Sequence, residues 1–124
     1  MTQIFENKVT PAIFFGVLQS SITTAKDVHW QTSSYAEHKT MEEYYNDMSS
    51  ILDKLVETYF GMLGKKFEIV TPKSGFVNSK AMIATLTNYV NSNRTIFKEY
   101  SCIQNIIDEV LQIIYQTNYR LTLS

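Results

Sequence analysis

Residues 37–62 read EHKTMEEYYNDMSSILDKLVETYFGM, and the spacing within this stretch decides the fold class. Its apolar residues recur every three or four positions, which places them on one face of an α-helix of about seven turns. The pattern ends near Gly61 and Gly64, because glycine favours helix C-termini. A helix with one apolar face must bury it, so we expect this face to lie in a core. Its members are Met41, Tyr45, Met48, Leu52, Leu55, Tyr59 and Met62.

Residues 11–32 form a second amphipathic segment earlier in the chain. Thr10 is a favourable helix N-cap, and Pro11 takes the first helical position, where the N–H that it lacks would have no partner. Ser33 and Ser34 break the pattern afterwards. The segment predicts a helix with one apolar stripe, formed by Phe14, Leu18, Ile22, Ala25 and Val28.

The second half of the chain predicts two more helices. Residues 79–99 carry apolar side chains at helical spacing, and either Asn78 or Ser79 can cap their N-terminus. The polar run 91–93 weakens the middle of this helix, because asparagine and serine are poor helix formers. Residues 102–121 carry the last apolar stripe.

Two signals mark the start of that last helix. Ser101 and Gln104 have the form of a capping box, which satisfies free N–H groups at a helix N-terminus. Cys102 is the sole cysteine, so an intrachain disulfide is excluded. We expect its thiol to be buried, as unpaired cysteines usually are.

The connection 64–78 (GKKFEIVTPKSGFVN) follows no helical period, although Phe67 and Ile69 need cover. Fully extended, it spans about 50 Å, more than the ~37 Å length of a helix of about 25 residues, so it can cross a bundle lengthwise. The sequence therefore predicts one all-α domain over residues 1–124, a four-helix bundle with a long connection between its second and third helices. The expected helices are 11–32, 37–62, 79–99 and 102–121.

The net charge, the apolar runs and the composition limit the possible functions of the chain. A net charge of -1 is unfavourable for general nucleic-acid binding, which needs a basic surface. No apolar run approaches the ~20 residues that cross a bilayer, and the first ten residues lack the basic and apolar regions of a leader. We expect a cytoplasmic protein or a virion component. Abundant Ile, Asn, Lys and Tyr with scarce Gly and Pro are typical of an AT-rich bacterial or viral genome.

Both histidines fall at the junction of the first two helices, where His29 ends one and His38 begins the next. Helical steps of about 100° per residue place Glu42, Asp53 and Glu57 at about 40°, 60° and 100° from His38, on the flank of the apolar stripe. Imidazole with two or three carboxylates is a ligand set that suits iron, manganese or zinc. The alternative interpretation of these acids is a solvated helix face.

The string Ala25–Gln31 (AKDVHWQ), followed by a turn and a second histidine, resembles the mini-ferritins, the DNA-protection-during-starvation (Dps) proteins of the ferritin-like superfamily. In that family a His-Trp-Asn string ends the first helix, a second His opens the next, and an acid follows one turn later. An Asp and a Glu four residues apart stand about four turns further on. The resemblance covers about residues 14–60. The matching residues are His29, Trp30, His38, Glu42, Asp53 and Glu57, with Gln31 for the Asn and Glu42 for an Asp.

The resemblance implies a ferritin-like bundle that oxidises Fe(II) between two subunits, for iron sequestration or protection against oxidative stress. The ligands would be His29 and His38 of one chain and Asp53 and Glu57 of its partner, with Glu42 assisting. Iron is the implied metal, and zinc or manganese would suit the same donors. The chain would form a homo-oligomer through its first two helices.

The chain also departs from that family. The turn between the histidines is about three residues shorter, and the connection 64–78 is short and polar for the small helix that family members place at their dimer interface. No lysine-rich tail is present, so DNA binding is not expected. The alternative function is a non-catalytic structural or interaction protein on the same bundle, such as a phage or virion component. Short phage-encoded ferritin-like proteins fit the length and composition.

Five aromatic residues cluster in sequence around the predicted site: Trp30, Tyr35, Tyr44, Tyr45 and Tyr59. The resemblance implies that Trp30 lies next to the metal ligands and donates electrons. For the tyrosines we favour packing in the core or at an interface.

Overall fold

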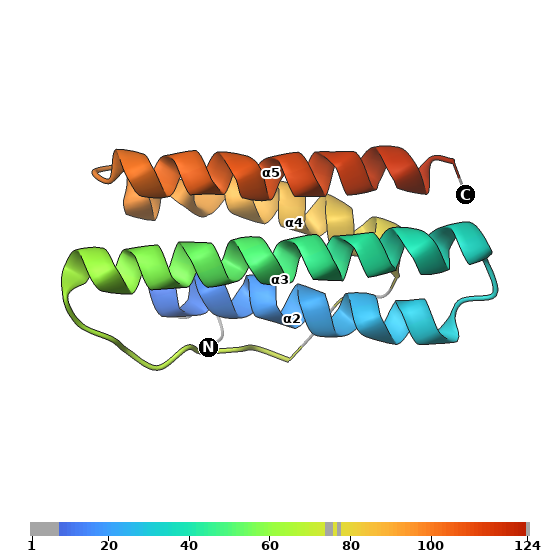
Figure 1. Ribbon diagram of the computed structural model, residues 1–124, viewed down its shortest axis with the longest axis horizontal. Helices are drawn as coiled ribbons and strands as arrows, with labels where there is room; N and C mark the ends of the chain where they lie inside the picture. The colour runs from blue at the N-terminus through green and yellow to red at the C-terminus, as the bar shows by residue number, and fades with distance from the viewer. Residues whose placement is uncertain (1–7, 74–75, 77, 124) are drawn as a thin grey trace.

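The structure, a computed structural model, describes residues 8–73, 76 and 78–123. Over these residues the chain forms four α-helices, one short 3-10 helix and no strand, which confirms the all-α prediction. The elements are α2 (Pro11–Gln31), α3 (Tyr35–Leu63), α4 (Ser79–Asn93), η1 (Arg94–Phe97) and α5 (Ser101–Leu121) (Figure 1). None of the described helices is both long enough and apolar enough to span a membrane.

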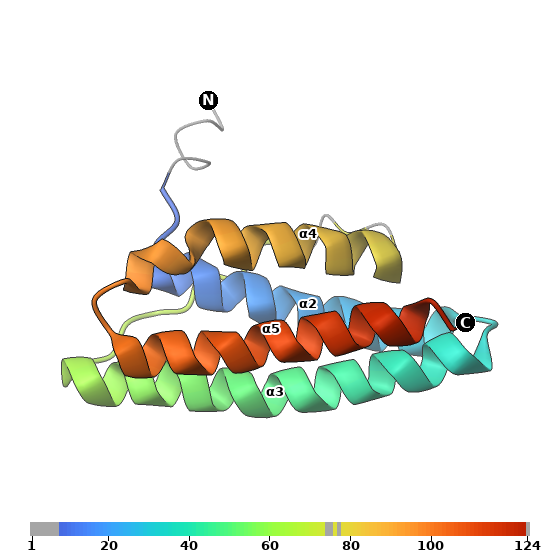
Figure 2. The same ribbon diagram turned by 90° about the horizontal axis from the view of Figure 1, so that it is seen from above.

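The four helices pack as a bundle in which neighbouring helices are antiparallel (Figures 1 and 2). α2 contacts α3 and α4, and α5 contacts the same two helices. α3 and α4 run in the same direction, so the chain between them must return along the length of the bundle. The predicted lengthwise connection between the second and third helices is therefore confirmed.

The connection between α3 and α4 lies against the first turns of α2. The Val70 N–H donates to the carbonyl of Ala12 at 3.2 Å, and Phe67 and Ile69 pack half-buried against the core. A Cβ on Gly16 would lie only 1.7 Å from the Val70 carbonyl oxygen. The absence of a side chain at this position therefore lets the connection pass close to α2.

The core is filled from all four helices, with aromatic rings grouped near the start of α2. η1 delivers Phe97 to this group, where its ring centroid lies 5.3 Å from that of Phe14 and 5.2 Å from that of Tyr59. Met41 and Met48 are fully buried, as predicted. The 3-10 turn after α4 is thus a packing element as well as a connection.

Two predictions about sulfur-containing side chains are wrong. Met62 was expected in the core but is 39% exposed, because it lies in the last turn of α3 near the end of the bundle. Cys102 was expected to be buried but is exposed, with its Sγ 4.0 Å from the Met62 Sδ. Ile103 and Ile106 form the buried face of the first turns of α5, which turns Cys102 outward.

The third helix is shorter than predicted, since α4 ends at Asn93 and the 3-10 helix follows. The Asn91 side chain donates to the Thr87 carbonyl at 2.9 Å, and the Asn93 side chain donates to the Tyr89 carbonyl at 2.9 Å. Asparagine side chains that bond local backbone groups compete with the helical ladder. The polar run thus ends the α-helix, whereas the sequence predicted only a weakening.

Three helix starts can be compared with their predicted caps. Thr10 caps α2 and Asn78 caps α4, as predicted. The capping box at Ser101 and Gln104 is wrong, because Ser101 lies inside α5 and no side chain caps that helix. Gln104 instead accepts from Arg94 Nε at 2.7 Å and donates to the Arg94 carbonyl at 2.8 Å. These two hydrogen bonds join Arg94, the first residue of η1, to α5.

Candidate metal centre

The turn between α2 and α3 brings both histidines together. It has only three residues, because α2 ends at Gln31 and α3 begins at Tyr35. Ser34 accepts a hydrogen bond from the Glu37 N–H at 3.1 Å, which caps α3. His29 in the last turn of α2 therefore lies beside the first turn of α3.

The two imidazole rings are bound reciprocally to each other's backbone. His29 Nδ1 lies 2.8 Å from the His38 carbonyl oxygen, and His38 Nδ1 lies 2.7 Å from the His29 carbonyl oxygen. The rings stack with their centroids 3.7 Å apart at an angle of 15°. A carbonyl oxygen can only accept, so each Nδ1 carries the proton. In the neutral rings both Nε2 atoms therefore keep a free lone pair, which is the arrangement of a metal-binding histidine.

Glu42 adds a carboxylate to this pair. One ligand atom each from His29, His38 and Glu42 lie within 4.8 Å of one another, and all three residues are half-buried. Two ligand atoms on one transition-metal ion lie up to about 4 Å apart, since each bond is about 2.1 Å long. The three donors thus fit one ion after a small side-chain adjustment. Two imidazoles and one carboxylate are a donor set suited to iron or zinc.

Glu42 also has a cation next to it within the same helix. Lys39 Nζ lies 3.0 Å from Glu42 Oε1. This hydrogen bond and the charge of the ammonium lower the pKa of Glu42, and the nearby His29 and His38 lower it further. Lys39 was not predicted as part of the site, although its spacing of three residues from Glu42 is the usual signal of a helical ion pair.

Two tyrosines flank the histidine pair. The Tyr45 ring meets His29 edge-on with centroids 5.4 Å apart, and the Tyr35 ring stacks on His38 at 6.0 Å. Lys26 Nζ lies 5.5 Å from the Tyr45 ring centroid. Tyr45 is half-buried and packs against His29, whereas Tyr35 is 76% exposed, so the predicted core packing does not hold for Tyr35 in the single chain.

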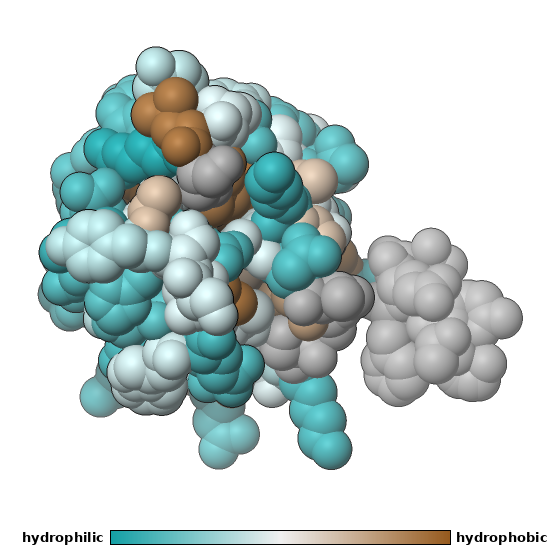
Figure 3. All heavy atoms as spheres, turned by 90° about the vertical axis from the view of Figure 1, so that its right-hand side faces the viewer, coloured by the Kyte–Doolittle hydropathy of each residue, from teal (hydrophilic) through white to brown (hydrophobic). Residues whose placement is uncertain are grey.

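Trp30 is 72% exposed and shares a shallow surface depression with both histidines. This end of the bundle faces the viewer in Figure 3, where the surface is mainly hydrophilic with few strongly hydrophobic side chains. The resemblance implies an electron-donating tryptophan next to the metal ligands, and Trp30 lines the same depression as His29 and His38. In the single chain the ring contacts to the histidines come from Tyr35 and Tyr45.

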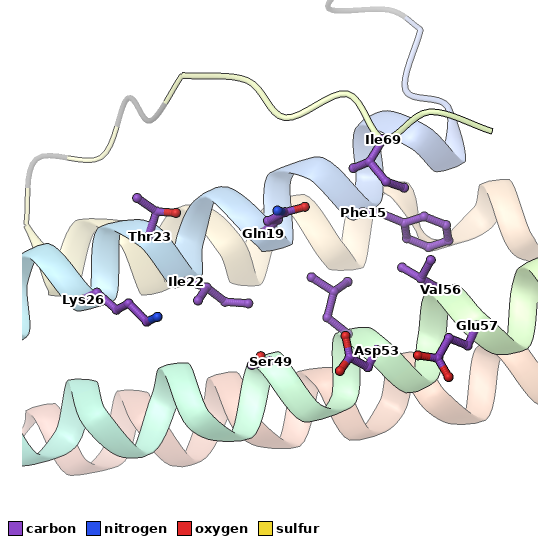
Figure 4. Close-up of a pocket in the computed structure, with 11 residues that line it drawn as sticks. Phe15, Gln19, Ile22, Thr23, Lys26, Ser49, Asp53, Val56, Glu57 and Ile69 are labelled. Atoms are coloured by element: carbon purple, nitrogen blue, oxygen red, sulfur yellow. The ribbon is translucent and has the colours of Figure 1, made fainter. Parts of the chain in front are cut away.

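Asp53 and Glu57 lie elsewhere in the same chain. They line a groove of about 420 Å³ between α2 and α3, together with Lys26 and the Ile69 side chain of the connection (Figure 4). Asp53 follows His38 by fifteen residues, which is about 22 Å along a helix. One chain therefore brings together His29, His38 and Glu42, while Asp53 and Glu57 remain apart from them.

The chain is thus an antiparallel helical bundle with a compact histidine–carboxylate cluster at one turn. Residues 29–121 match the model of a family of unknown function (DUF5856), and the chain belongs to that family. It is also similar to the uncharacterized 14.6 kDa protein in the mobD-ri intergenic region of Enterobacteria phage T4. The two are 27% identical over 111 residues, which cover 89% of this chain and 86% of the phage protein. A comparison with solved structures gave no significant match.

Proposed function

We propose that this protein is a ferroxidase-like mini-ferritin, which binds Fe(II) as its substrate and oxidises it for iron sequestration or protection against oxidative stress. The observation that carries the proposal is the reciprocal pair of hydrogen bonds between His29 and His38. These bonds leave both Nε2 atoms unprotonated in neutral rings, and a Glu42 carboxylate oxygen lies within 4.8 Å of a ring nitrogen of each histidine. Zinc and manganese are the other ions that suit these donors.

The connectivity of the bundle supports the proposal. Ferritin-like folds have four helices and one long crossover connection. Here the crossover joins α3 to α4, and every pair of neighbouring helices is antiparallel. The resemblance of the His29–Trp30 string and its acids to mini-ferritins points the same way.

A second copy of the chain completes the ligand set in this proposal. If α3 packs antiparallel against α3 of a partner, with a two-fold axis near the middle of the stretch, the two halves of the site meet. His38 then faces Glu57 of the partner subunit, and Glu42 faces Asp53 of the partner subunit, because both pairs share one midpoint in the sequence. A two-fold contact repeats the arrangement, so each dimer would hold two sites. We therefore propose homo-oligomerisation through α3 and through α2, which carries His29.

The proposed reaction is the oxidation of Fe(II) by hydrogen peroxide or oxygen. Two Fe(II) ions would give one electron each to one hydrogen peroxide molecule, which takes up two protons and leaves as two water molecules, so that no hydroxyl radical is formed; oxygen would take two electrons and two protons in the same way and leave as hydrogen peroxide. The imidazoles hold Fe(II), and the added carboxylates of the partner favour the more highly charged Fe(III). Buried reactive groups are not required, since the metal itself is oxidised.

The test is an anaerobic titration of the metal-free chain with Fe(II), followed by addition of peroxide or oxygen while the ferric absorbance is recorded. We expect binding, and oxidation faster than in buffer. The double variant His38→Gln with Asp53→Asn should lose both activities and keep its helical circular dichroism. Glu99→Gln is the control, because it removes one exposed carboxylate outside the proposed ligand set. No binding and no acceleration over buffer would overturn the proposal.

A structural or interaction role is the second candidate. Its supporting observation is that the same hydrogen bonds between His29 and His38 fasten the ends of α2 and α3 without any metal. The similarity to a phage protein fits a phage or virion component, or a protein of the infected bacterial cytoplasm. Solution mass separates the candidates: a metal-dependent dimer or larger assembly supports the first, and a mass that metal leaves unchanged supports the second.

A further inference from the structure

Lys39 is placed to control Glu42, the carboxylate that lies beside the histidine pair in the described part of the chain. Its ammonium lies 3.0 Å from Glu42 Oε1, while a ligand atom of Glu42 lies within 4.8 Å of those of both histidines. A bound metal ion and the ammonium would therefore share one carboxylate. Two cations this close repel each other.

Among the described residues, Glu42 is the acid that forms an ion pair with Lys39. Glu43, the neighbouring acid on α3, pairs instead with Arg120 of α5, whose Nε lies 3.3 Å from a Glu43 carboxylate oxygen. The Lys39 and Glu42 side chains are 48% and 36% exposed. An ion pair with this exposure is weak and exchanges easily, so it can compete with a metal without blocking the site.

We infer that Lys39 competes with the metal ion for Glu42. Its ammonium neutralises the charge of the Glu42 carboxylate in the metal-free protein, and metal binding displaces the ammonium from the carboxylate. The inference rests on the proposed metal-binding function and adds a residue that sets its affinity. With Glu42 neutralised, the metal-free chain offers two neutral imidazoles. Such a site favours transition metals over calcium and magnesium, which depend on anionic oxygen ligands.

The test compares Zn(II) binding to the metal-free wild-type chain and to Lys39→Met by isothermal titration calorimetry. We expect Lys39→Met to bind Zn(II) about three- to tenfold more tightly, since it loses the competing cation and its repulsion. Lys39→Arg keeps the charge and should stay close to the wild-type affinity. Lys98→Met is the matched control, because it removes an exposed lysine beside η1, at the far end of the bundle from the histidine turn.

Ionic strength gives an independent readout. The difference in Zn(II) affinity between wild type and Lys39→Met should decrease as the salt concentration rises from about 0.01 M to about 1 M. Over this range the screening length of charges falls from about 30 Å to about 3 Å. A merely structural effect of the substitution would not follow salt in this way.

The outcomes separate this inference from the proposed function. A wild-type chain that binds no Zn(II) overturns both. Wild-type binding with no tightening in Lys39→Met, or with equal tightening in Lys39→Arg, overturns the competitor role of Lys39 and leaves the metal site standing.

Discussion

Two tyrosine hydroxyls lie inside the bundle in contrasting surroundings. Tyr44 donates to Ser21 Oγ at 2.7 Å, and Ser21 donates in turn to the Leu18 carbonyl at 2.6 Å. The Tyr89 hydroxyl is buried and finds no hydrogen-bond partner among the described residues. Burial raises the pKa of both phenols, that of Tyr89 to about 12. Both rings therefore stay neutral near pH 7.

These surroundings predict opposite effects of removing the hydroxyl. Tyr44→Phe should lower the free energy of unfolding by about 1–2 kcal/mol, because it breaks a buried hydrogen bond and leaves Ser21 short of a donor. Tyr89→Phe should change it by less than about 0.5 kcal/mol or raise it, since an unpartnered buried hydroxyl contributes only a desolvation cost. Urea unfolding measures both. Equal losses of unfolding free energy in Tyr44→Phe and Tyr89→Phe would contradict this prediction.

At the scale of elements, the close approach of the crossover to α2 makes a prediction about glycine. Gly16→Ala should destabilise the protein by about 1–3 kcal/mol, because its Cβ would overlap the Val70 carbonyl oxygen at 1.7 Å and the connection would have to move. Gly61→Ala is the matched control inside α3, where a Cβ meets nothing within 4 Å. It should stabilise by about 0.5–1 kcal/mol through helix propensity alone. Thermal and urea unfolding distinguish the loss of stability expected for Gly16→Ala from the gain expected for Gly61→Ala.

The start of α4 is held by a carboxylate from another helix. Glu37, in the first turn of α3, accepts hydrogen bonds from the hydroxyls of Thr32 and Ser79. Ser79 is almost fully buried at the first position of α4. Glu37 thus joins the histidine turn to the N-terminus of α4, where a negative charge is also favourable for the helix dipole.

Removing this carboxylate should loosen α4 at its N-terminus. Glu37→Ala should lower the free energy of unfolding by about 1–3 kcal/mol, since two hydroxyl donors lose their acceptor. Amide hydrogen exchange should quicken first near Ala81 and Met82. Glu37→Gln keeps one acceptor oxygen and should lose about half as much stability. Unchanged exchange in Glu37→Ala would show that packing alone holds α4.

The elements that the sequence predicted well are those set by local patterns. Helix periodicity and the caps Thr10 and Asn78 give all four helix starts close to the observed ones, because these signals act within one turn. The failures came from side chains with distant or competing partners. Gln104 has the spacing of a capping box, yet it binds Arg94 of the preceding 3-10 helix. No local pattern distinguishes those two uses of the same amide.

At the scale of the whole molecule, the candidate site was predictable only in part. The chain has two histidines, and the three-residue turn between their helices forces them together, so sequence spacing was sufficient for that pair. The ring stacking and the reciprocal hydrogen bonds depend on the exact helix register and were not predictable. In the proposed site, Asp53 and Glu57 would meet the histidines only across a second chain, and a single sequence contains no direct record of how copies pack.

Mixing two damaged copies tests whether the site is shared between subunits. A copy with His38→Gln and a copy with Asp53→Asn and Glu57→Gln should each be inactive in Fe(II) oxidation. In a mixed dimer one site receives both substitutions and the other receives neither. After random exchange of subunits, about a quarter of the wild-type activity should therefore return. No recovery in a mixture shown by mass to contain mixed dimers would place the whole site within one chain.

The ordering of the histidine pair lowers the entropy that the proposed metal binding would lose. Folding has already restricted the rotation of both imidazoles, because each ring is bound to the other's backbone and stacked on it. An arriving ion therefore finds its nitrogen donors already ordered, and little conformational entropy is lost on binding. In the proposed function, such a site would fill and empty many times without the chain refolding, which suits the repeated turnover of metal that Fe(II) oxidation requires.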